Sequence, residues 1–279
     1  MIRIVRPVGA VCLGLALLAA TGCGGGSSSS TSASSSIDFG SNNPLKVTAF
    51  GDSITQGVLE LQRRDFGLST SNNYPAVLQG KLKTRDPAWI VVNRGVGGEE
   101  TRGGAARLPG VLALDHPGFV LIMEGTNDAT DCLDATSIAA NLRGMVQIAK
   151  ANKTVPLIGT VTPNFRNDPC ARDVVNQVNV EIRNIASSEN IVLAEIFEGM
   201  NDRSLFGQSP SRDPLHPNDR GYAVMADIWF QAMLKVIPPP VAAAPPVAAA
   251  PPVAAAPPVT AAPPVTAAPP ATAAQRRRR

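Results

Sequence analysis

Short apolar runs alternate with longer amphipathic stretches through the middle of the chain. The apolar runs, rich in β-branched residues, occupy residues 46–50, 89–93, 119–123, 155–161 and 191–195. The stretches with a helical pattern occupy residues 74–85, 101–114, 135–151, 173–189 and 218–236. Strands separated by helices of this length favour a parallel sheet with helices on both faces. Roughly 190 residues are enough for one such core, so we predict a single domain over residues 44–237.

One internal segment breaks this alternation. Residues 59–73 show no regular period and include the charged run Arg63-Arg64-Asp65. The segment begins shortly after Thr55, so we expect either a solvated surface loop or a rim over the turn that precedes it.

The first residues have the pattern of an export signal. A short basic region is followed by an apolar run over residues 8–20, which is shorter than the ~20 residues that a membrane helix needs. The next residues, Ala20-Thr21-Gly22-Cys23, resemble a bacterial lipobox, although Ala stands where Leu is usual. We therefore predict a signal peptide over residues 1–22 and lipidation of Cys23, with an ordinary secretory signal as the alternative. Three acyl chains would anchor the protein firmly, at ~0.8 kcal/mol per buried methylene.

The segments that flank the predicted domain have low-complexity sequences. Residues 23–43 are rich in Gly and Ser, which indicates a flexible tether. Residues 238–279 repeat the hexapeptide Pro-Pro-Val-Ala-Ala-Ala and end in four arginines. This composition favours extended polyproline II and cannot bury a core. We interpret the arginines as a solvated end, with contact to an anionic cell-wall polymer or lipid as the alternative.

The positive net charge comes from arginines near the two ends of the chain. The formal value of +3 includes Arg3, Arg6 and the four terminal arginines. Without these six residues, acidic side chains outnumber basic ones by three. The predicted domain therefore has no basic surface of the kind that binds nucleic acid, and we expect no such partner.

Cysteine usage also favours export. Of the four cysteines, Cys12 lies in the predicted signal and Cys23 at the predicted lipid site, which leaves Cys132 and Cys170 as an even pair. Such a pair can form a disulfide in an oxidising compartment. Two unrelated buried thiols are the alternative. We predict a bacterial membrane-anchored lipoprotein that faces the periplasm or the cell surface.

A serine and a histidine form the candidate reactive pair. Ser53 follows the first strand in Gly51-Asp52-Ser53-Ile54-Thr55, and a serine is a useful nucleophile only beside a base. The chain has two histidines. His116 precedes the third predicted strand, whereas sites in open α/β sheets lie at the strands' carboxyl ends. His216 follows Asp213 by three residues, so that carboxylate can orient its ring. We predict a Ser53–His216–Asp213 triad, with a plain helix cap as the alternative for Ser53.

Two further segments can supply hydrogen-bond donors. Gly97-Gly98 follows the second strand, and glycine lets a backbone N–H approach a ligand closely. Asn127 follows the third strand in Gly125-Thr126-Asn127-Asp128, and its NH₂ group can stabilise a developing negative charge. A glycine-rich turn and an Asx turn are the alternatives.

These four segments, in this order, resemble the SGNH/GDSL hydrolase family of esterases and lipases. The resemblance covers residues 46–229. It implies a three-layer α/β/α sandwich around a five-stranded parallel sheet, of flavodoxin-like type. It also implies an oxyanion hole formed by the Ser53 and Gly98 amides and the Asn127 side chain. Gly97 is the alternative to Gly98 if the motif is shifted by one residue. The G-x-S-x-G turn of α/β-hydrolases is absent.

The resemblance implies a serine carboxylic-ester hydrolase that works through an acyl-enzyme. Residues 213–222 resemble the corresponding segment of carbohydrate esterases, so we expect short acyl esters of sugars or polysaccharides as substrates. A lysophospholipase or thioesterase for longer chains is the alternative, and a non-catalytic wall-tethering lipoprotein is an alternative of another class. Nucleotide binding is disfavoured because no glycine fingerprint for phosphate follows the first strand. We expect no cofactor and no metal.

Overall fold

The computed structural model describes residues 37–62, 65–68, 72–207 and 214–237. The predicted signal peptide, Cys23, most of the Gly/Ser tether, Asp213 and the Pro/Ala tail lie outside these residues. The predictions made for them therefore stay predictions. Among the helices of the described residues, none has the length and hydropathy needed to cross a bilayer.

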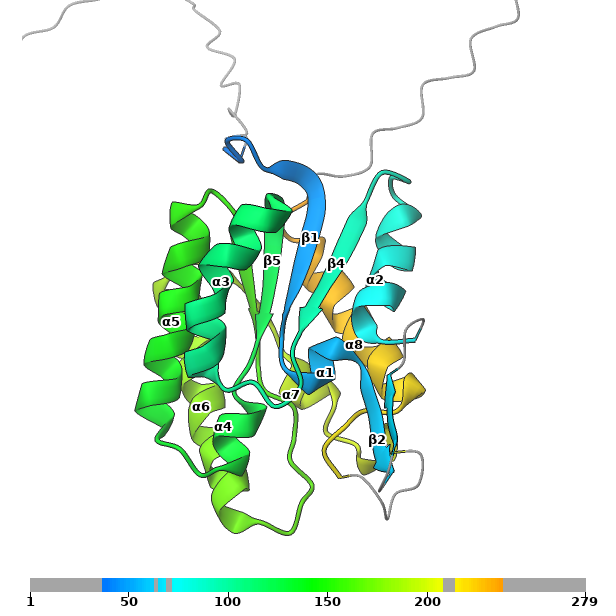
Figure 1. Ribbon diagram of the computed structural model, residues 1–279, viewed down its shortest axis with the longest axis vertical. Helices are drawn as coiled ribbons and strands as arrows, with labels where there is room; N and C mark the ends of the chain where they lie inside the picture. Colours follow the sequence, from blue (N-terminus) through cyan, green and yellow to red (C-terminus); the bar gives the residue numbers. More distant parts are fainter. Residues whose placement is uncertain (1–36, 63–64, 69–71, 208–213, 238–279) are drawn as a thin grey trace, which may run out of the picture.

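Five parallel strands form the central sheet (Figure 1). In spatial order they are β4 (Ile90–Gly95), β1 (Asn43–Gly51), β5 (Pro117–Met123), β6 (Val155–Gly159) and β7 (Val192–Ala194). All five predicted strands are present. After β1 the chain adds β4 on one side of it and then β5 on the other, so the topology switches at β1. In open α/β sheets, sites form at the carboxyl end of such a switch point.

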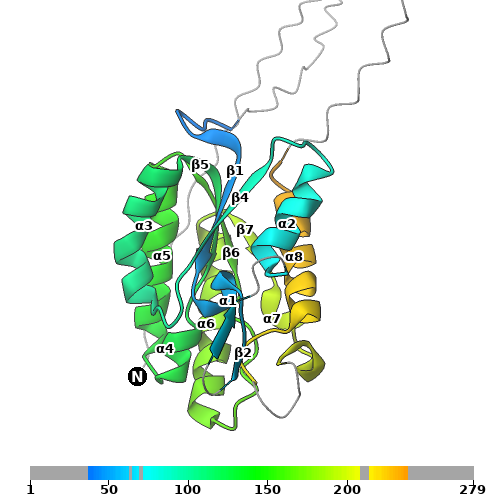
Figure 2. The ribbon, with the colours of Figure 1, turned by 45° about the vertical axis from the view of Figure 1, so that its right-hand side comes forward.

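Helices cover both faces of the sheet, which confirms the predicted three-layer α/β/α sandwich (Figures 1 and 2). One layer contains α3 (Thr101–Asp115), α5 (Ala135–Ala151) and α6 (Pro169–Ser188). The other contains α2 (Tyr74–Lys83) and α8 (Asp219–Met233). The remaining helices are short: α1 (Ser53–Gln56), α4 (Thr126–Thr130), α7 (Ile196–Gly199) and the 3₁₀ turn η1 (Arg203–Leu205).

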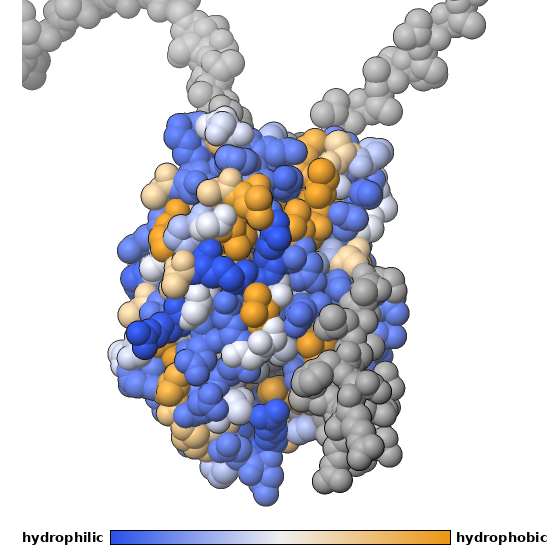
Figure 3. Space-filling view, in the orientation of Figure 1, coloured by the Kyte–Doolittle hydropathy of each residue, from blue (hydrophilic) through white to orange (hydrophobic). Residues whose placement is uncertain are grey.

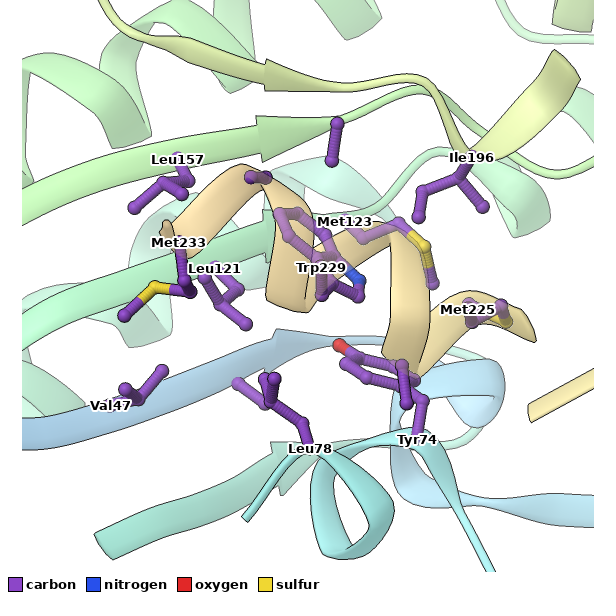
Figure 4. Packing of buried hydrophobic residues seen from close by; sticks show 14 of the residues in the cluster. Val47, Tyr74, Leu78, Leu121, Met123, Leu157, Ile196, Met225, Trp229 and Met233 are labelled. Atoms are coloured by element: carbon purple, nitrogen blue, oxygen red, sulfur yellow. The ribbon is translucent and has the colours of Figure 1, made fainter. Parts of the chain in front are cut away.

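Alternation along the central strands divides the core between the two faces. On β5, Phe119, Leu121 and Met123 pack on the α2/α8 side, whereas Val120 and Ile122 pack on the α3/α5/α6 side. Successive strand residues point to opposite faces, so a strand buried on both sides is apolar throughout. Figure 4 shows the α2/α8 side, where the Trp229 ring stacks on Tyr74 with ring centroids 6.3 Å apart. Polar residues predominate on the described surface in Figure 3.

Polar caps set where several helices begin. Asn73, Asp134, Asp168 and Asn218 each accept a hydrogen bond from a backbone amide in the first turn of the helix that follows. Capping of this kind satisfies an amide that has no partner inside the helix. The cap at Asp168 starts α6 at Pro169, four residues before the predicted start, because proline is well suited to a helix's first position.

The structure differs from the predictions in two other places, the irregular segment and the start of the domain. Within the irregular segment, β2 (Val58–Gln62) and β3 (Asp65–Leu68) pair as an antiparallel hairpin, which no alternation had indicated. At the amino end, the Phe39 ring lies 5.3 Å from that of Phe119, and Asn42 donates to the Asn152 carbonyl. The packed domain therefore begins by Phe39, inside the segment predicted as tether.

Candidate active site

Three of the four motif segments meet at the carboxyl edge of the sheet. In the strand register, Gly51 at the end of β1 pairs with Gly95 on β4 and with Met123 on β5. The turns that follow these residues therefore start side by side, and α1 and α4 lie at this edge in Figure 1. A Cβ atom on Gly95 would lie only 2.1 Å from the Gln56 backbone nitrogen, so glycine is required for α1 to pack against β4.

Ser53 and His216 are in hydrogen-bond contact. The Ser53 Oγ lies 3.0 Å from the His216 Nε2, although the residues are 163 positions apart. Ser53 is the first residue of α1, and Asp52 caps that helix by accepting from the Ile54 amide at 2.8 Å. Both side chains of the pair are buried, with 7 % and 3 % of their surface exposed. The structure thus brings the predicted nucleophile and base together at the switch point.

Backbone pairing holds the His216 segment in place. The His216 carbonyl accepts from the Gly207 amide at 2.9 Å, and the Asn218 amide donates to the Leu205 carbonyl at 2.9 Å. Asn218 also donates through its side chain to the Gly207 carbonyl at 2.9 Å. Asp213 lies outside the described residues, so its orienting role stays a prediction.

His116 lies at the opposite edge of the sheet. It caps the carboxyl end of α3 in a left-handed conformation with φ of 46°, directly before β5. Its carbonyl accepts from the Asn43 amide at the start of β1. His116 is therefore a turn residue far from the Ser53–His216 pair.

The glycine turn after β4 lies against α1. A Cβ atom on Gly97 would lie 3.9 Å from the Ser53 Cβ and 2.9 Å from the Gln56 Oε1. Gly98 has φ of 76°, a left-handed conformation that disfavours other residues, and no atom lies within 4 Å of its Cβ position. Gly97 thus borders the serine, and the left-handed backbone of Gly98 explains why glycine follows it.

Asn127 joins the third motif to this turn. Its Nδ2 donates to the Glu99 carbonyl at 2.8 Å, and the same NH₂ group carries a second N–H. Asn127 lies in the first turn of α4, which follows Gly125 with φ of 119°. The amide side chain is therefore fixed beside the Gly97–Gly98 turn.

Hydrogen bonds between Asp128 and Thr101 connect α4 to the start of α3. Local sequence patterns did not indicate this contact. The Asp128 carboxylate accepts from the Thr101 amide at 2.9 Å and from the Thr101 hydroxyl at 2.6 Å. Glu100, the residue before α3, makes no side-chain cap. Asp128 therefore caps α3 from a distance and joins α3 to α4.

Asp52 is a fully buried carboxyl group beside the reactive pair. Burial raises its pKa from 3.8 to about 6, and the Ile54 amide, the Thr126 hydroxyl and the His216 charge oppose this shift. The sequence analysis gave Asp52 no role beyond its place in the Gly51–Thr55 motif. The structure adds a titrating group near His216.

The two cysteines of the predicted pair lie close together. Cys132 follows α4, and Cys170 is the second residue of α6. Their Cα atoms are 5.9 Å apart and the structure joins their sulfurs, a separation within the usual range for disulfides. The link would attach the end of the Asn127 helix to α6. Formation of the disulfide in the exported protein stays a prediction.

No cluster of three or more metal-ligating side chains occurs within the residues that the structure covers.

Comparisons with known proteins identify a family. The profile of the GDSL-like Lipase/Acylhydrolase family matches residues 49–224. A protein described as Esterase TesA from Pseudomonas aeruginosa is 35% identical over 117 residues, which is 41% of this chain and 54% of that protein. One described as Thioesterase 1/protease 1/lysophospholipase L1 from Escherichia coli is 31% identical over 108 residues, 39% of this chain and 47% of that protein. The chain thus spans about half the length of these curated relatives.

Solved structures share the fold. The crystal structure of Axe2, an acetylxylan esterase from Geobacillus stearothermophilus, aligns with a TM-score of 0.56 at 24% identity. The alignment covers 69% of this chain and 95% of that one. This similarity supports the architecture described above.

Proposed function

Because the chain belongs to the GDSL-like lipase/acylhydrolase family, we propose that it is a serine carboxylic-ester hydrolase. The observation that carries the proposal is the 3.0 Å contact between the Ser53 Oγ and the His216 Nε2. This pair lies where the Gly97–Gly98 turn and Asn127 converge. A nucleophile, a base and donors for an oxyanion are the parts that acyl transfer requires.

The proposed mechanism follows from these positions. The Ser53 Oγ attacks the ester carbonyl carbon while the His216 Nε2 accepts its proton. The oxygen that becomes negative is held by the Ser53 and Gly98 amides and by the Asn127 Nδ2. His216 then protonates the departing alcohol, and water attacks the acyl-serine by the same route. Asp213 would orient the His216 ring.

For the substrate, we propose short acyl esters of carbohydrates. The support is the resemblance of residues 213–222 to the corresponding segment of carbohydrate esterases and the shared fold with an acetylxylan esterase. A second candidate, hydrolysis of longer acyl chains, is supported by the relative whose name includes thioesterase and lysophospholipase.

We further propose that the enzyme is exported and anchored through lipid on Cys23. The support is the sequence of residues 1–23 alone. In this arrangement the Gly/Ser segment separates the catalytic domain from the membrane. The Pro/Ala tail is a solvated end in this proposal, with contact to a cell-wall polymer as the alternative.

Rates on a series of p-nitrophenyl esters test the activity and the substrate class. Acyl chains from two to sixteen carbons are compared with acetylated xylan and with a lysophospholipid, and Ser53→Ala is the blank. We expect the highest kcat/KM at two to four carbons, together with release of acetate from xylan. A maximum at twelve or more carbons would favour the lysophospholipase or thioesterase instead. Wild-type rates equal to those of Ser53→Ala on every substrate would contradict ester hydrolysis and favour the wall-tethering role.

A further inference from the structure

Glu124 is a buried carboxyl group placed between the sheet and the candidate oxyanion site. It follows the last residue of β5 and precedes Gly125, with only 1 % of its surface exposed. The backbone of α3 presses on it, because a Cβ atom on Gly104 would lie 2.6 Å from the Glu124 Oε2. Neither Glu124 oxygen has an N–H or O–H donor at hydrogen-bond distance among the described residues. A charged Glu124 would therefore be poorly stabilised.

The cation beside Glu124, that of Arg107, is engaged by another carboxylate. The Arg107 guanidinium forms a two-point ion pair with Glu99, in which its Nε lies 2.8 Å from the Glu99 Oε1. It also stacks over the Phe50 ring, 4.1 Å from the ring centroid. Its Nη2 lies 3.9 Å from the Glu124 Oε1, beyond hydrogen-bond distance. Arg107 thus compensates Glu99 directly and Glu124 only at longer range.

Glu99 and Glu124 are neighbouring carboxyl groups, because the same Arg107 Nη2 pairs with the Glu99 Oε2 and lies 3.9 Å from the Glu124 Oε1. Burial, together with the Glu99 and Asp52 charges, raises the pKa of Glu124 far above its ordinary value, and Arg107 only partly opposes this. This direction favours the neutral acid, whose O–H can donate to the neighbouring Glu99 carboxylate. A carboxyl–carboxylate hydrogen bond of this kind is charge-assisted and strong.

Glu99 in turn holds the parts of the oxyanion site. Its carbonyl accepts from the Asn127 Nδ2 at 2.8 Å. Its amide donates to the Val96 carbonyl at 3.2 Å and so closes the turn that contains Gly97 and Gly98. A shift of Glu99 would therefore move the Gly98 amide and the Asn127 side chain together.

We propose that Glu124 is a positioning residue: as a neutral donor it holds the Glu99 side chain beneath the glycine turn, and Glu99 keeps the Gly98 and Asn127 donors directed at one point. This proposal rests on the proposed ester hydrolysis. An apolar residue of the same size fills the same space but removes the donor to Glu99. A glutamine keeps a donor there, because its NH₂ group can replace the carboxyl O–H.

Three variants separate positioning from general stability. Glu124→Gln keeps the donor, and Glu124→Leu removes it. The control, Asp115→Leu, removes a different buried carboxylate, which ends α3, accepts from the Thr48 hydroxyl at 2.9 Å and pairs with Arg94. Asp115 ends the helix that Thr101 begins, about 20 Å along its axis from the oxyanion turn.

The readouts are kcat and KM for p-nitrophenyl acetate, the inhibition constant of phenylboronic acid, and the melting temperature. Boronic acids form a tetrahedral serine adduct whose oxygen occupies the oxyanion site, so their affinity reports how well the donors are directed. We expect Glu124→Leu to lower kcat about tenfold with KM within about twofold, since complete loss of one donor costs ~10²–10³. Boronate affinity should fall by a similar factor. Glu124→Gln should stay within about threefold of wild type, and Asp115→Leu should lower the melting temperature alone.

Two results would overturn the proposal. One is Glu124→Leu with wild-type kcat and boronate affinity, and the other is Glu124→Gln with the same loss as Glu124→Leu. If Glu124→Leu does not fold, Glu99→Ala gives the same test from the other partner: it should lower kcat and boronate affinity about tenfold, and wild-type values would contradict the proposal. Failure of the proposed function is distinct, because wild type would then hydrolyse no ester faster than Ser53→Ala.

Discussion

Replacing Asn127 with alanine should reduce catalysis far more than it reduces stability. Asn127 is half-buried, and among the described residues its side chain makes one hydrogen bond, from its Nδ2 to the Glu99 carbonyl at 2.8 Å. Losing that bond costs about 1 kcal/mol of folding free energy. Losing an oxyanion donor costs ~10²–10³ in kcat, or roughly 3–4 kcal/mol of transition-state stabilisation.

The chain contains a matched control for this substitution. Asn42 also donates from its Nδ2 to a carbonyl at 2.8 Å, that of Asn152, but it lies at the amino end of β1. Asn42→Ala therefore removes the same chemical group and a bond of the same length at the edge opposite the site. We expect it to cost comparable or greater stability, since Asn42 is more buried, and to leave kcat unchanged.

Steady-state rates on p-nitrophenyl acetate and urea unfolding measure the two effects. The expected result is kcat at least a hundredfold lower for Asn127→Ala, with KM within a few-fold, because the lost interaction forms only in the transition state. A loss of less than about fivefold would refute the assignment of Asn127 to the oxyanion. So would a rise in KM with unchanged kcat, which would indicate ground-state binding.

Three further predictions follow from the site. His216→Ala should lower kcat by several orders of magnitude and His116→Ala by less than about threefold; steady-state rates check this, and the reverse order would assign the base to His116. Because burial raises the pKa of Asp52 to about 6, folding favours its protonated form, and the stability that this provides below about pH 4 is lost as the pH rises through about 6. Urea unfolding of wild type and Asp52→Asn from about pH 3 to about pH 8 should show wild type losing about 3 kcal/mol relative to the variant; a difference that does not change with pH would disagree. The Cys132–Cys170 link closes a separation of 38 residues, with a ceiling on the order of 4 kcal/mol, and it attaches the Asn127 helix to α6, so reduction should lower kcat more than the melting temperature. Thiol titration of the unreduced, unfolded mature protein checks the bond first, and two free thiols would show that it is absent.

The layers of the fold could be predicted because their signals are local. β5 is apolar throughout, which a strand buried on both faces requires. The Ser53–His216 pair could also be predicted, because the chain has only two histidines and one precedes a strand. The β2–β3 hairpin escaped prediction because residues 58–68 do not alternate in polarity. The early start of α6 depends on the cap at Asp168, which the helical period alone does not reveal.

The supporting contacts of the site could not be predicted from local patterns. Asp128 caps α3 across 27 positions of sequence. Glu124 directly follows the apolar run 119–123 in the sequence, and only the structure shows Glu99 and Arg107 beside it. Acidic residues are common on surfaces, so their sequence gives no sign that they are buried. Motifs identified the groups proposed to react, whereas the groups that hold them in place depend on tertiary packing.

Covalent labelling of the serine tests the central claim most directly. Wild type and Ser53→Ala are incubated with diethyl p-nitrophenyl phosphate, which phosphorylates activated serines, and intact mass and peptide mapping follow. The account predicts one diethylphosphoryl group per chain, located on Ser53, with loss of esterase activity in proportion to labelling and no adduct on Ser53→Ala. An unlabelled wild type, or an adduct on another residue that forms equally in Ser53→Ala, would contradict the assignment of Ser53 as the nucleophile.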